Sequence, residues 1–153
     1  MKKFEFSLGR VKDYKELVLD REKGTLSRLQ GAKNRLETRM EGIAKNRRAL
    51  DLELKDKTAA GVTVAEIQSY RFQIDGLQKL LDGLRLEHER LSAQVEAQMQ
   101  VVVTAKREVS GMEKLEEKQL EEYRQETAAA QQREIAEFVE TRVAAQSREE
   151  EEG

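Results

Sequence analysis

Apolar residues recur at alternating steps of three and four along the second half of the chain. The ladder has seventeen positions, of which thirteen are apolar in a chain that is 38% hydrophobic. Its positions are Ile67, Tyr70, Ile74, Leu77, Leu81, Leu84, His88, Leu91, Val95, Gln98, Val102, Ala105, Val109, Met112, Glu116, Gln119 and Tyr123. A seam with this spacing, sustained for about eight heptads, predicts a coiled-coil helix.

The first half carries a less regular stripe of the same kind. Its main positions, at steps of seven and on the neighbouring row, are Leu26, Leu29, Leu36, Met40, Ile43, Leu50 and Leu54. Leu8, Val11 and Val18 continue it in a shifted phase, as a stutter allows. Lys33 and Arg47 interrupt the second row, and we expect their stems to lie along the seam.

Turn chemistry concentrates between the two stripes. Gly61 can adopt the left-handed conformation that closes a helix, and Thr63 with Glu66 forms a capping box that opens the next one. So short a connection predicts antiparallel helices. We therefore expect an all-α fold, a long antiparallel two-helix coiled-coil hairpin that forms a single domain over 1–153, with helices at about 7–59 and 64–140 and a turn at about 60–63.

The two predicted helices differ in length. Folding about Gly61 brings Leu8 near Lys114, so roughly the last 30 residues extend beyond the partner helix. An apolar stripe continues there through Ile135, Phe138, Val139 and Arg142. The acidic segment at about 147–153 is expected to be a frayed tail.

Composition supports a thin helical protein. The chain is 38% charged and has no proline, no cysteine and no tryptophan, so helices can run long and a thick core is excluded. It has no apolar run of about 18 residues, and Glu5 interrupts the apolar residues near the N-terminus. We expect neither a membrane span nor a signal peptide, and a cytoplasmic location.

Charge is distributed unevenly. Residues 1–60 hold 16 Lys/Arg and 10 Asp/Glu, whereas residues 113–153 hold 6 and 13. This asymmetry favours two helices that fold back on each other with opposite charges beside the seam. Nucleic-acid binding is the alternative, but the basic residues alternate with acidic ones and lack stacking aromatics, so we expect no nucleic-acid partner.

The residues offer no catalytic or cofactor chemistry. A single histidine without cysteine cannot supply a structural zinc site, and neither a phosphate-binding loop nor a nucleophile elbow is present. Carboxylates on a thin rod face water, which leaves them without the desolvation that tunes catalytic groups. We therefore expect no enzyme activity, no metal and no cofactor.

Two features suggest contacts with other proteins. His88 occupies a seam position, where it either fixes the register of the helices or contacts a partner. Phe72, Leu80 and Leu86 lie off the ladder, so part of this segment is expected to stay exposed for another protein.

Short motifs stand at the start of each predicted helix. The opening Phe4-x-Phe6-x-Leu8 and Val11 is followed by Lys15-Glu16 and Arg21-Glu22, and the second helix opens with Ile67-x-x-Tyr70. With these motifs, its length, the break near residue 60 and the charged tail, the chain resembles the flagellar export protein FliJ family over its whole length.

The resemblance implies a soluble component of the flagellar type III export apparatus, needed for motility, with a hairpin similar to the central stalk of rotary ATPases. The partners it implies are the hexameric export ATPase, the cytoplasmic part of the membrane-embedded export gate, and export chaperones; association with the inner membrane would be peripheral, through these partners. Segments 4–18 and 112–138 would enter the ATPase ring.

The resemblance also suggests particular contact residues. Those for the ATPase ring are Phe4, Phe6, Leu8, Val11, Tyr123, Ile135 and Phe138. Those for the export gate are Phe72, Leu77, Leu81, Leu84 and His88. The equivalent stalk of a virulence secretion system and a generic coiled-coil scaffold remain alternatives.

Overall fold

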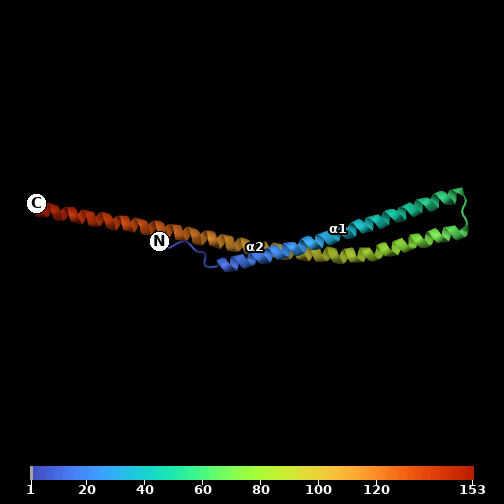
Figure 1. Ribbon diagram of the computed structural model, residues 1–153, viewed down its shortest axis with the longest axis horizontal. Coiled ribbons are helices and arrows are strands. Elements are labelled where there is room, and N and C mark those ends of the chain that lie inside the picture. The colour runs from blue at the N-terminus through green and yellow to red at the C-terminus, as the bar shows by residue number, and fades with distance from the viewer. Residues whose placement is uncertain (1) are drawn as a thin grey trace. The chain divides into compact units, whose positions relative to one another are not determined.

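Two α-helices make up most of the chain. The computed structural model describes residues 2–153, in which α1 spans Gly9–Ala60 and α2 spans Val64–Glu152 (Figure 1). No strand occurs in those residues. The two helices pack against each other, which confirms the all-α, two-helix hairpin predicted from the seam.

The helices divide into two compact units. The first unit combines the N-terminal segment up to Leu17 with Lys106–Gly153, and the second comprises Val18–Ala105. Each unit contains part of α1 and part of α2. A single domain over 1–153, as expected from the sequence, stays a prediction.

The connection between α1 and α2 has the predicted chemistry. Gly61 has a φ of 99°, which a residue with a Cβ adopts only under strain. The hydroxyl of Thr63 then accepts a hydrogen bond of 3.3 Å from the backbone N–H of Glu66, which caps the start of α2. Gly61 therefore ends α1 and Thr63 begins α2, with only three residues between the two helices.

The core of the second unit is a single row of side chains between the helices. Its buried members are Leu36, Leu81, Leu84, Val95, Val102 and Ala105. Polar contacts across the seam separate these apolar layers: Arg47 donates to Gln78, and the Gln98 amide donates to the backbone carbonyl of Glu22 at 3.0 Å. Such contacts favour one register, because a slip would leave them unpaired.

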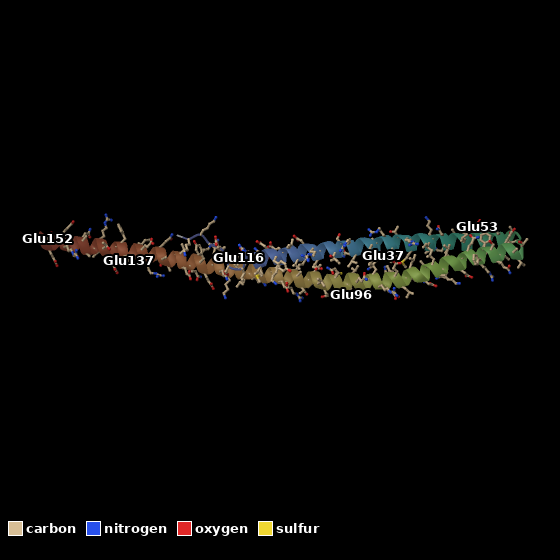
Figure 2. The ribbon with its side chains drawn as sticks, turned by 60° about the horizontal axis from the view of Figure 1, so that its bottom comes forward. Glu37, Glu53, Glu96, Glu116, Glu137 and Glu152 are labelled. Carbon is tan, nitrogen blue, oxygen red and sulfur yellow. The ribbon has the colours of Figure 1, made fainter. Side chains whose placement is uncertain are left out.

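In the first unit, the beginning of α1 packs beside α2 through opposite charges. The Lys12 ammonium lies 2.6 Å from Glu116, and that of Lys15 lies 3.2 Å from Glu108. Basic side chains of the first helix therefore meet acidic ones of the second, as the charge asymmetry predicts. Figure 2 shows Glu116 on α2 where α1 lies beside it.

The end of α2 differs from the expectation. The sequence suggested a helix to about 140 and a frayed tail at 147–153, whereas α2 continues to Glu152. Its last forty residues contain no proline and no glycine before Gly153, and they are rich in Ala, Glu, Gln and Arg, which favour helix. Glutamates near a helix C-terminus oppose the macrodipole, but that effect is smaller than the summed propensity.

In the described residues, no helical stretch is apolar enough over a sufficient length to cross a membrane.

Candidate partner-binding surfaces

The residues suggested for the export gate fall into two groups. Leu81 and Leu84 are only 4% and 6% exposed, because they form the core between α1 and α2. Leu77 and His88 are half-buried at the same seam, whereas Phe72 is 82% exposed. The structure thus separates Phe72, which another protein can reach, from leucines that hold the hairpin together.

Two further apolar side chains lie exposed on the same segment of α2, as the sequence predicted. Leu80 is 42% exposed and Leu86 is 59% exposed. We call Phe72, Leu80 and Leu86 the outer stripe. Gly76 and Gly83 lie between its members, and a Cβ added at either glycine would meet no atom within 4 Å. This side of α2 is therefore open to an approaching partner.

His88 has a contact within the hairpin. Its Nε2 lies 2.9 Å from Oε1 of Glu37 on α1. The imidazole is therefore engaged across the seam, which favours the register interpretation over direct contact with a partner.

Two aromatic residues suggested for the ATPase ring, Phe4 near the N-terminus and Tyr123 on α2, contact each other. The rings of Phe4 and Tyr123 lie 5.5 Å apart between centroids, and the Tyr123 hydroxyl donates to the backbone carbonyl of Lys2. Phe6 and Leu8 are half-buried, and Val11 is 40% exposed. Residues 2–8, which we call the N-terminal strap, thus lie along α2 before any partner binds.

The remaining residues suggested for the ATPase ring lie on α2 beyond this strap. Every residue from 130 to 153 is exposed, including Ile135 at 63% and Phe138 at 64%. Val139 and Val143 extend the same helical side, and we call Ile135, Phe138, Val139 and Val143 the terminal stripe. Figure 2 shows Glu137 and Glu152 on this stretch of α2, where α1 does not lie beside it.

A third exposed surface includes Val11, which the sequence suggested for the ATPase ring, and two residues that sequence reasoning missed. Val11, Tyr14 and Leu17 occur at steps of three on α1, and Tyr14 and Leu17 are 62% and 59% exposed. We call these three residues the base patch. Steps of three on a helix are a detectable signal, but the irregular seam of the first half hid it.

Two lysines with raised pKa values lie at contacts between the helices. The hydrogen bond that the Lys12 ammonium donates to Glu116 holds the pKa of Lys12 above its ordinary value. Contact with Tyr70 does the same for the pKa of Lys57, whose ammonium lies 5.1 Å from the centre of that ring. Both lysines link α1 to α2. Within residues 2–153, no cluster of His, Asp and Glu has the arrangement of a metal site.

Comparison with known proteins identifies the family. Residues 4–148 match the family described as flagellar FliJ protein. Neither the curated proteins nor the solved structures contain a significant match. Because the match covers almost the whole chain and the two-helix hairpin agrees with it, this chain belongs to the flagellar FliJ family, which serves flagellar type III protein export.

Proposed function

We propose that this chain is a non-enzymatic central-stalk component of the flagellar export apparatus. It binds the hexameric export ATPase, promotes assembly of the ring and raises its rate of ATP hydrolysis. It also contacts the cytoplasmic part of the export gate and the export chaperones. Through these partners it associates peripherally with the inner membrane from the cytoplasm.

One observation carries this proposal: in a chain of this family, the terminal stripe lies on a stretch of α2, residues 130–152, that no other segment of the described chain covers. A lone amphipathic helix that exposes Ile135 and Phe138 gains stability when a partner covers them. We infer that the lumen of the export ATPase ring offers such cover on all sides.

The mechanism is coupling through contact. A stalk inside a ring presents a different side of the helix to each identical subunit, so its binding energy differs between subunits. A ligand shifts a conformational equilibrium only by its differential affinity for the states. The stalk therefore favours the assembled ring and biases which subunit binds or hydrolyses ATP, without catalytic groups of its own.

The outer stripe serves the second partner. Phe72, Leu80 and Leu86 lie in the second unit, whereas the terminal stripe lies in the first. We assign the outer stripe to the export gate, with Leu77, Leu81 and Leu84 supporting it from within the hairpin. Separate surfaces allow one chain to serve both partners.

Two single variants test this assignment against each other. Phe138→Asp is expected to abolish binding to the export ATPase and to leave gate binding unchanged, and Phe72→Asp is expected to do the reverse. Both side chains are mostly exposed, so the helix content and melting temperature of each variant should match the wild type. Equal binding of both partners by both variants would contradict the assignment.

A further inference from the structure

The base patch and the terminal stripe have complementary chemistry. Val11, Tyr14 and Leu17 lie on a segment, residues 2–17, with five Lys/Arg and three Asp/Glu. The terminal stripe lies on residues 130–153, which hold three Arg and seven Glu. One surface is therefore apolar with an excess of positive charge, and the other is apolar with an excess of negative charge.

The two surfaces cannot meet within one chain. Lys12 and Lys15 contact Glu116 and Glu108, so the base patch lies beside that part of α2. The terminal stripe begins at Ile135, about 20 residues further along the same helix. At a rise of about 1.5 Å per residue, roughly 30 Å or more separates the surfaces.

We propose that two copies of this chain form an antiparallel dimer in which the terminal stripe of each copy packs on the base patch of the other. A twofold axis across α2, about midway between the two surfaces, makes both contacts at once. Such an interface is closed, so it stops at two copies instead of growing into a filament. It covers all seven apolar side chains of both surfaces in each copy.

Charge favours this arrangement over a dimer in which the two terminal stripes pack on each other. Pairing two terminal stripes with each other would place glutamates opposite glutamates, which opposes association. Pairing a terminal stripe with a base patch instead places Glu134 and Glu137 in the region of Arg10. The run Ala128–Ala130 lies close to the proposed axis, where small side chains let two helices approach closely.

The dimer has a consequence for activity that rests on the proposed function. It covers Ile135 and Phe138, the residues assigned to the export ATPase. A chain in the dimer then cannot bind the export ATPase, so the dimer is an inactive form that must dissociate first. The dimer itself depends only on the two surfaces of this chain.

Disulfide trapping tests the arrangement directly, because the chain has no cysteine. A mixture of Tyr14→Cys and Phe138→Cys variants is oxidised and resolved on a non-reducing gel. A disulfide needs Cα atoms within about 7 Å, so a mixed covalent dimer requires contact between copies. The matched control replaces Tyr14→Cys by Phe72→Cys, which is more exposed but lies outside both surfaces.

The expected result is rapid formation of the 14–138 dimer and much slower formation of the 72–138 dimer. Light scattering on the wild-type chain should show an average mass that rises from that of one chain to that of two as the protein concentration increases. The Phe138→Glu variant should raise the dissociation constant about tenfold or more, and added salt should also weaken the dimer.

A monomeric mass at every concentration would overturn the proposal, as would cross-linking of Phe138→Cys to itself at the rate of the mixed pair. Neither experiment contains the ATPase. A negative result here therefore leaves the proposed function standing, and a failure of ATPase binding leaves the dimer standing.

Discussion

The imidazole Nε2 of His88 on α2 lies 2.9 Å from the carboxylate Oε1 of Glu37 on α1. This pair occupies a ladder position between Leu84 and Leu91, where an aliphatic residue would pack on both neighbours. It exchanges apolar packing for a polar contact that only one register satisfies.

Replacing His88→Leu is expected to raise the free energy of unfolding by about 0.5–1 kcal/mol, because a partly buried polar pair gives way to apolar packing. Urea unfolding followed by circular dichroism measures the change. Glu37→Gln is the matched control and should alter stability by less than about 0.5 kcal/mol. A large loss of stability in His88→Leu would contradict a role limited to register.

The buried leucines should behave differently from the outer stripe. Leu81→Ala is expected to lower the free energy of unfolding by about 2–3 kcal/mol, since it leaves a gap between the helices. Leu86→Ala removes the same atoms from an exposed site and should cost less than about 0.5 kcal/mol. If the two variants unfolded alike, Leu81 would not be the core residue described above.

Glycine variants should separate the turn from the helix interior. Gly61→Ala is expected to destabilise the hairpin by about 1–2 kcal/mol, because its φ of 99° strains any residue with a Cβ. Gly42→Ala is expected to stabilise it by about 0.5–1 kcal/mol, since a Cβ there meets no atom within 4 Å and alanine favours helix. Thermal melts measure the change in stability of each variant. A change of the same sign in both variants would contradict the different roles of the two glycines.

The contact between Lys12 and Glu116 gives a pH prediction. The hydrogen bond raises the pKa of Lys12 above its ordinary value of 10.5, so its stabilising contribution is complete below that pH and disappears as pH rises through the folded value. The difference in melting temperature between the wild type and Lys12→Gln should therefore shrink in strongly alkaline solution. In Lys12→Arg the difference from Lys12→Gln should persist, because the guanidinium stays charged. A pH-independent difference in both cases would contradict the ion pair.

Periodicity and turn chemistry were sufficient to predict the hairpin. The ladder from Ile67 to Tyr123 identified the seam, and five of its members, Leu81, Leu84, Val95, Val102 and Ala105, form most of the core of the second unit. Gly61, Thr63 and Glu66 gave the turn correctly, because a positive φ and a capping hydroxyl are local properties of single residues.

The surfaces were harder to predict. Periodicity shows which side of a helix is apolar, but not which apolar residues a thin seam covers. The family resemblance suggested both Phe72 and Leu84 for the export gate, yet one is exposed and the other is buried. The pairing of Phe4 with Tyr123 joins segments distant in sequence, and no local pattern predicts it. The end of α2 was misplaced because clustered glutamates suggested fraying, whereas helix propensity prevailed.

The stalk function is tested most directly by the rate of ATP hydrolysis by the export ATPase, measured with its oligomeric state, in the presence and absence of this chain. A central stalk should promote ring formation and raise the rate, so we expect both effects from the wild-type chain. Phe72→Asp should do the same, and Phe138→Asp or truncation of either terminal segment should do neither. An ATPase that neither binds the chain nor changes its rate, while the chain associates tightly with itself, would contradict the stalk function and leave a generic coiled-coil scaffold.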